Sequence, residues 1–135
     1  MRFAIAVAAG GACGSLARWL VAGWVQRRVD SGAGWSALFP AGTLAVNLLG
    51  CFAIGFLATL YEERLAVEPA LRTFVLVGVI GGFTTFSAFG FETLALLRAG
   101  SLAIAVANVA ASVAGGLGGV WLGAALARLA GGGAP

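Results

Sequence analysis

Residues 70–97 read ALRTFVLVGVIGGFTTFSAFGFETLALL, and this apolar stretch decides the fold. It is longer than the roughly 20 residues that a helix needs to cross a bilayer core. Its centre combines Gly81-Gly82 with Thr84-Thr85, which are poor residues for a helix interior. We therefore predict a membrane helix that is broken near residues 81–85, close to the bilayer midplane. Irregular backbone at that depth is tolerated only where protein buries it or a cavity hydrates it, so the break marks a candidate functional site.

Three further apolar runs surround this one, at residues 3–25, 41–60 and 102–126. The chain is 61% hydrophobic and 10% charged, with a mean hydropathy of +1.02, whereas soluble domains carry about a quarter charged residues. We predict an all-α membrane protein in which residues 1–135 form a single transmembrane domain of four helices. Residues 128–135 are predicted to form a disordered tail.

The charged residues lie mostly between the apolar runs. There are eight arginines, five acids, no lysine and no histidine, which gives no basic nucleic-acid surface, no metal-ligand spacing and no nucleophile-base pair of an enzyme. On the predicted topology, one side of the membrane carries Arg2, Arg64, Arg72 and Arg128, and the other carries Arg27, Arg28 and Arg98. Because this is almost no bias, we favour an antiparallel, dual-topology homodimer over a single weakly specified orientation.

Polar side chains occur inside the apolar runs at helical spacing. Thr43 and Asn47 share one face of the second run, and Asn108 and Ser112 share one face of the fourth. Asn47 either joins the helices through a hydrogen bond or lines a pore. The two faces can pack together or enclose water.

Two charged side chains also lie within the runs. Arg18 either extends its guanidinium to the membrane interface or faces an aqueous vestibule and attracts anions. Glu92 either faces water, pairs with an arginine or carries protons. Phe86 and Phe89, one helical turn apart, either pack or present their partly positive ring edges to an anion.

Residues 81–89, GGFTTFSAF, closely resemble the signature GG-x-TTFS-x-F of the Fluc (CrcB) fluoride channels of bacteria. GACGSLAR at residues 11–18, GTLAVNLLG at residues 42–50 and Glu92 also agree with that family. The resemblance implies a dual-topology antiparallel homodimer in the lipid bilayer of the bacterial plasma (inner) membrane. It also implies that fluoride leaves the cytoplasm passively through two pores, each built from both subunits.

The resemblance assigns roles to individual residues. It implies that the ring edges of Phe86 and Phe89 and the amide of Asn47 line each pore. The polar groups that it places beside the pore are Thr43, Ser112, Glu92 and, toward a vestibule, Arg18. It further implies a structural Na⁺ at the dimer interface, held by the backbone carbonyls of Gly81 and Thr84 of both subunits.

The chain departs from the family at three positions. Many relatives have a Thr or Ser between the two phenylalanines where this chain has Ala88, and some carry Tyr where Asn108 stands and Ser where Gly116 stands. These changes affect the polar lining beside the pore. Two other functions remain open, a small proton-coupled exporter of the multidrug type that uses Glu92, and a membrane assembly factor that transports nothing.

Overall fold

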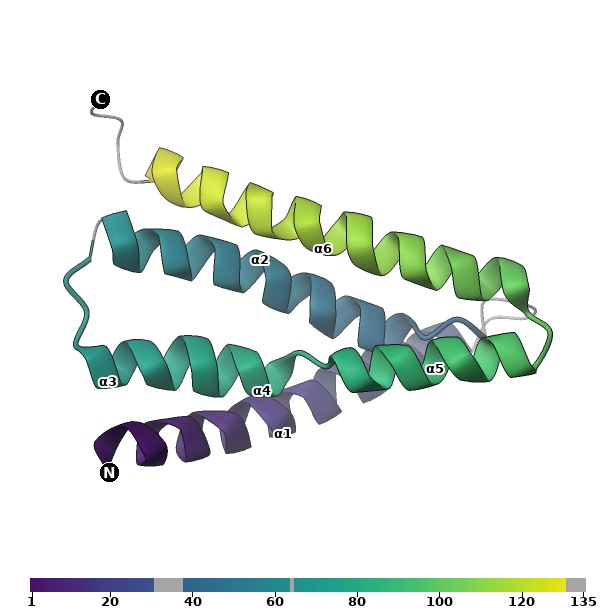
Figure 1. The fold of residues 1–135 in the computed structure, drawn as a ribbon, viewed down its shortest axis with the longest axis horizontal. Coiled ribbons are helices and arrows are strands. Elements are labelled where there is room, and N and C mark those ends of the chain that lie inside the picture. Colours follow the sequence, from purple (N-terminus) through teal and green to yellow (C-terminus); the bar gives the residue numbers. More distant parts are fainter. Residues whose placement is uncertain (31–37, 64, 131–135) are drawn as a thin grey trace.

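The computed structural model describes residues 1–30, 38–63 and 65–130 and shows them as a bundle of long helices (Figure 1). The stretches that are long and apolar enough to span a membrane are α1 (Arg2–Asp30), α2 (Ala41–Glu63), the composite stretch Pro69–Arg98 and α6 (Leu102–Ala130). This confirms the prediction of an all-helical chain with four membrane spans. Only 11–22% of the residues in the most apolar window of each stretch are buried, so most of the apolar surface is left for lipid or another subunit.

The helices pack in two main pairs, α2 along α6 and α1 along the first half of the composite stretch (Figure 1). Glycines permit close contact in the first pair, because a Cβ added to Gly123 would lie 2.8 Å from the amide nitrogen of Phe56. In the second pair, a Cβ added to Gly10 would lie 2.9 Å from the Cα of Gly78. Small residues thus let the backbones approach, as is common between membrane helices.

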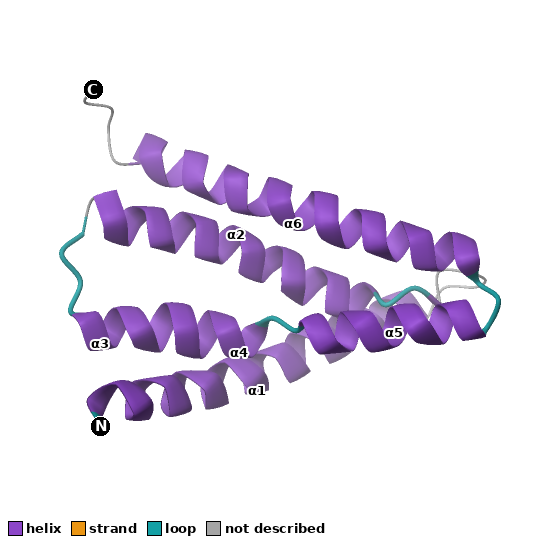
Figure 2. Ribbon diagram, in the orientation of Figure 1, coloured by secondary structure: helices purple, strands orange, loops and turns teal. Residues whose placement is uncertain are grey.

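The composite stretch contains α3 (Pro69–Arg72), the π-helix η2 (Thr73–Ile80), α4 (Gly81–Phe83) and α5 (Phe86–Arg98). Thr84 and Thr85, between α4 and α5, have extended backbone with φ/ψ of −84°/157° and −150°/110°, and Figure 2 shows them as a short loop. Thr85 caps α5, because its Oγ1 accepts a hydrogen bond of 3.2 Å from the amide of Ala88. Within the predicted interval 81–85, Gly81 and Gly82 are helical, and the depth of this loop in a bilayer stays a prediction.

The end of the fourth span differs from the sequence prediction. Residues 128–130 belong to α6 rather than to a tail, and the Nε of Arg128 donates to Glu63 Oε1 of α2 over 3.1 Å. This pairing explains why the helix continues past the apolar run. The rest of the predicted tail, residues 131–135, lies outside the described residues.

Candidate functional site

A side-chain amide from α2 holds the loop between α4 and α5. Nδ2 of Asn47 donates to the carbonyl oxygen of Thr85 over 3.0 Å, and the amide of Thr85 donates to Oδ1 of Asn47 over 2.8 Å. In a continuous α-helix, that amide would donate to the carbonyl of Gly81, four residues earlier. Asn47 therefore replaces the helical acceptor that the amide of Thr85 lacks, and it also donates to the carbonyl of the same residue.

Helix α1 reaches the same loop from another side. Nη1 of the half-buried Arg18 donates to the carbonyl oxygen of Thr84 over 3.3 Å. The Thr84 hydroxyl donates back to the carbonyl of Ile80 over 3.1 Å. Both extended residues thus have their carbonyl groups bonded to side chains of neighbouring helices.

A cavity of about 520 Å³, called the Phe cavity here, opens beside this loop. Its lining residues are Asn47, Gly50, Cys51, Ile54, Leu76, Ile80, Gly81, Thr84, Thr85, Phe86, Phe89, Ser112, Val113, Gly116, Leu117 and Val120. The rings of Phe86 and Phe89 have centroids 5.4 Å apart and planes tilted by 47°, and Phe86 is 83% exposed. The hydroxyl oxygen of Ser112 is buried and has no hydrogen-bond partner among the described residues. The cavity is therefore mostly apolar, with a few convergent polar groups, as is typical of binding sites.

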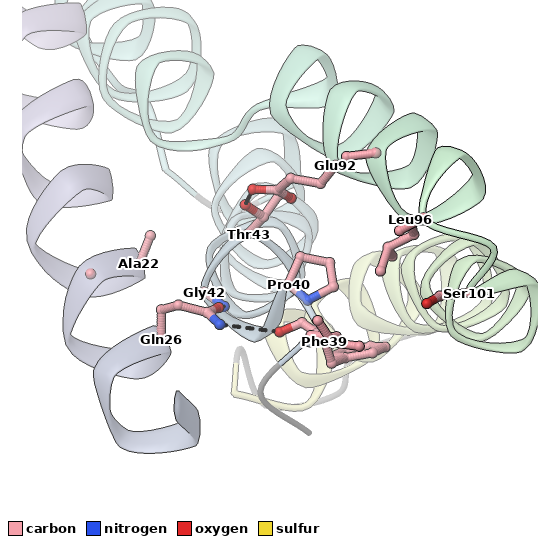
Figure 3. Close-up of a pocket in the computed structure, with 13 residues that line it drawn as sticks. Ala22, Gln26, Phe39, Pro40, Gly42, Thr43, Glu92, Leu96 and Ser101 are labelled. Carbon is pink, nitrogen blue, oxygen red and sulfur yellow. Dashed lines mark hydrogen bonds between the residues drawn. The ribbon is translucent and has the colours of Figure 1, made fainter. Parts of the chain in front are cut away.

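A second cavity of about 590 Å³, called the Glu92 cavity here, lies between the end of α1, the start of α2 and α5 (Figure 3). Its lining residues are Ala22, Gly23, Gln26, Leu38, Phe39, Pro40, Gly42, Thr43, Glu92, Ala95, Leu96, Ala99 and Ser101. The Thr43 hydroxyl donates to Oε1 of Glu92 over 2.7 Å. Oε2 of Glu92 is buried and has no partner in the part of the chain that the structure describes.

Gln26 joins α1 to the beginning of α2 at the edge of the Glu92 cavity. Its Oε1 accepts from the amide of Gly42 over 3.0 Å, and its Nε2 donates to the carbonyl of Phe39 over 3.2 Å (Figure 3). The first amides of a helix have no partner within the helix, so Gln26 supplies one from α1. This clamp fixes the position of Thr43, which follows Gly42 directly.

The predicted site residues fall into separate groups. The structure brings Asn47, Phe86, Phe89 and Ser112 together around the Phe cavity, with Gly81 and Thr84 in the same lining. Thr43 and Glu92 line the Glu92 cavity. Arg18 lines neither cavity and contacts the loop at Thr84.

The three residues that depart from the family pattern also lie in different places. Gly116 lines the Phe cavity, whereas Ala88 and Asn108 do not. Asn108 is 2% exposed and donates to the hydroxyl of Thr93 over 2.9 Å.

Thr93 and Thr85 were not predicted as site residues. A threonine directly before a helix is a common capping residue, so the sequence did contain a signal for the role of Thr85. Gln26 was not predicted either, because in the sequence it is simply the first of three adjacent polar residues, Gln26, Arg27 and Arg28, after the first apolar run.

Comparison with known proteins identifies the family. Residues 5–124 match the family described as CrcB-like protein, Camphor Resistance (CrcB). Proteins named "Fluoride-specific ion channel FluC" from Solibacter usitatus and Stutzerimonas stutzeri are 48% and 46% identical, over 90% and 96% of this chain and 95% and 99% of their own. A protein of the same name from Desulforapulum autotrophicum is 47% identical over 91% of this chain and 94% of its own. With the four membrane spans, these matches confirm the resemblance seen in residues 81–89, and the chain belongs to the CrcB-like family of multi-pass bacterial membrane proteins.

Proposed function

We propose that this protein is a passive fluoride-selective channel. It is a membrane transport protein rather than an enzyme, because the relatives that match nearly its whole length are named fluoride-specific ion channels. The observation that carries the proposal is the Phe cavity, in which the rings of Phe86 and Phe89 meet the amide of Asn47. The Phe cavity has two aromatic rings in contact beside this amide, whereas the Glu92 cavity has the single ring of Phe39 beside the amide of Gln26.

The chemistry of this cavity suits a small anion. The edge of a phenylalanine ring carries partial positive charge, so it attracts an anion without the strong binding of a fixed cation that would trap it. An asparagine amide nitrogen carries two N–H donors, and Asn47 uses one on the carbonyl of Thr85. The second N–H remains to donate to fluoride. The buried hydroxyl of Ser112 adds a further donor in the same cavity.

Exposure supports an assembly of two subunits. Phe86 is 83% exposed in the single chain, although it lines the Phe cavity. We infer that a second copy of the chain, antiparallel to the first, covers this side and completes each of two pores. The nearly balanced arginines allow insertion in both orientations. A passive pore exports fluoride whenever its concentration is higher in the cytoplasm.

The backbone of the loop between α4 and α5 fits the Na⁺ that the family implies. The carbonyl of Gly81 lacks the amide of Thr85 as a helical donor, because that amide bonds to Asn47. The carbonyl of Thr84 accepts a long hydrogen bond of 3.3 Å from Arg18 and retains a second lone pair. The Gly81 and Thr84 carbonyls of both subunits would hold Na⁺, a hard cation that prefers oxygen ligands. The positive charge of the ion would offset the partial negative charge of these oxygens at the interface.

Reconstitution in liposomes tests the proposal, with a fluoride electrode to follow efflux and a chloride electrode for comparison. We expect fast fluoride efflux without chloride efflux from the wild type, and a sharp loss of rate in Phe86→Ile and Asn47→Asp. The matched control is Phe91→Ile, because Phe91 is on the same helix, 72% exposed and in neither cavity lining. Equal rates for all four proteins would remove the pore assignment.

The buried, unpartnered Oε2 of Glu92 favours a second candidate, a proton-coupled exporter. An exporter of that kind exchanges protons for substrate, so an imposed pH gradient would drive substrate against its own gradient. A channel only lets fluoride follow its electrochemical gradient. The relatives' names favour the channel.

A further inference from the structure

A partly buried polar chain links α6 to the backbone of Phe89. Nδ2 of Asn108 donates to the Thr93 hydroxyl over 2.9 Å, and that hydroxyl donates to the carbonyl oxygen of Phe89 over 2.7 Å. Because the hydroxyl carries a single proton, accepting from Asn108 leaves that proton for Phe89. Consecutive hydrogen bonds polarise one another, so each one strengthens the next.

The burial of Asn108 makes this chain costly to lose. Its side chain is 2% exposed, and Asn108 and Val46 are the largest fully buried side chains among the described residues. A buried amide without a hydrogen-bond partner is strongly unfavourable. Thr93 therefore satisfies Asn108, while Asn108 fixes the rotamer of Thr93.

Helix α5 has few other supports near its aromatic residues. It is held at its start by the pairing of Asn47 with Thr85, at Glu92 by the Thr43 hydroxyl of α2, and near its end by the cluster of Leu96, Ile104 and Ala105. Between these points one side is open, because a Cβ added to Gly90 would meet nothing within 4 Å. The chain from Asn108 through Thr93 is thus the support closest to Phe89.

We propose that Asn108 and Thr93 are positioning residues that fix how α5 presents the Phe89 ring to the Phe cavity. The two residues lie outside the cavity lining and act through the Phe89 carbonyl. A threonine that bonds back to the carbonyl four residues earlier also bends its helix slightly. Removing the hydroxyl therefore changes the rotation and the bend of α5 at Phe89, and with them the orientation of the Phe89 ring. The consequence for fluoride flux rests on the proposed function, whereas the consequence for the ring does not.

The test places 4-fluorophenylalanine at position 89, or at position 56 of α2 as a reference, and records ¹⁹F NMR spectra of the full-length protein. Phe56 stacks on Phe52 and lines neither cavity. Thr93→Val keeps the shape of the side chain and removes the hydroxyl, and Thr93→Ser restores a hydroxyl. We expect Thr93→Val and Asn108→Leu to shift or split the resonance at position 89 and to leave that at position 56 in place. Thr93→Ser should restore the wild-type spectrum. The double variant, which combines Thr93→Val with Asn108→Leu, should change the resonance at position 89 no more than Thr93→Val alone does.

Thr59→Val is the matched control. The buried Thr59 of α2 makes the same kind of bond, from its hydroxyl to the carbonyl of Gly55 over 2.8 Å, and it lines neither cavity. It should leave the ¹⁹F resonance at position 89 and the efflux rate unchanged. Thr93→Val should slow fluoride efflux in liposomes by about two- to fivefold, since one hydrogen bond of about 1 kcal/mol corresponds to about fivefold at most.

The outcomes separate the two proposals. An unchanged resonance at position 89 in Thr93→Val, or an equal change in Thr59→Val, overturns the positioning role whatever the flux. A wild type that carries no fluoride overturns the channel, and the ¹⁹F spectra still decide whether the ring is positioned.

Discussion

Replacing Asn47 with leucine should destabilise the protein because it leaves the amide of Thr85 without a partner. Leucine has the same number and branching of side-chain heavy atoms as asparagine, so the substitution keeps the shape of the side chain. It removes the donor to the carbonyl of Thr85 at 3.0 Å and the acceptor for its amide at 2.8 Å. Thr85 is the N-cap of α5, so its carbonyl still accepts the first bond of that helix, whereas its amide has no partner there.

The magnitude follows from the two lost bonds. Leaving a buried donor or acceptor unsatisfied costs about 1–3 kcal/mol. Asn47 and Thr85 are only partly buried and face a cavity, so water can satisfy part of what is lost. We expect the free energy of unfolding to fall by about 1–3 kcal/mol in Asn47→Leu, mostly because of the amide, since the carbonyl keeps its helical donor.

Unfolding by SDS in mixed micelles, followed by the fluorescence of the four tryptophans, measures this change at one fixed protein concentration. Ser112→Ala is the matched control, because it removes a polar group from the same cavity that makes no hydrogen bond in the described structure. Such a change should stay within about 0.5 kcal/mol of the wild type. If Asn47→Leu costs no more than Ser112→Ala, the pairing does not hold the loop, and the reasoning is wrong.

Two further substitutions test the surroundings of the loop. Gly50→Ala places a methyl group against Cγ2 of Thr84, which should displace Thr84, cost about 1–3 kcal/mol of unfolding free energy and slow fluoride efflux. Gly90→Ala, where the methyl group meets nothing within 4 Å, should do neither, and equal effects would refute this account. Glu92→Gln keeps an oxygen to accept from Thr43. Fluoride should follow its own gradient with and without an opposing pH gradient in both wild type and Glu92→Gln, whereas uphill movement would favour the exporter.

The helices could be predicted from the sequence because hydropathy and length determine them. In a chain that is 61% hydrophobic, the four apolar runs can satisfy their backbone in a bilayer only as helices. The π-helix Thr73–Ile80 could not be predicted, because the apolar sequence TFVLVGVI suits an α-helix equally well. Its geometry coincides with the close approach of Gly78 to Gly10 on α1, and such tertiary contacts leave no local signal.

The candidate site could be predicted only in part for a related reason. Helical spacing places Thr43 and Asn47 on one face of α2, yet they line different cavities. Thr43 bonds to Glu92 and Asn47 bonds to Thr85, two positions on the composite stretch that are separated by two turns of α5. Which cavity each residue joins depends on how α5 lies along α2, and spacing within one helix contains no information about that.

Asn47 has a role both in folding and in the proposed function. Ending α4 at Phe83 removes the helical partner of the Thr85 amide, whereas the amide of Thr84 still donates to the carbonyl of Ile80. The extended loop is therefore stable only because another helix provides the missing partner. Asn47 provides it to Thr85, so the loop exists only when α2 is in place. The same amide then has one N–H left for an anion. A substitution at position 47 therefore lowers flux by two routes, and measuring both unfolding and efflux of the same variant tells them apart.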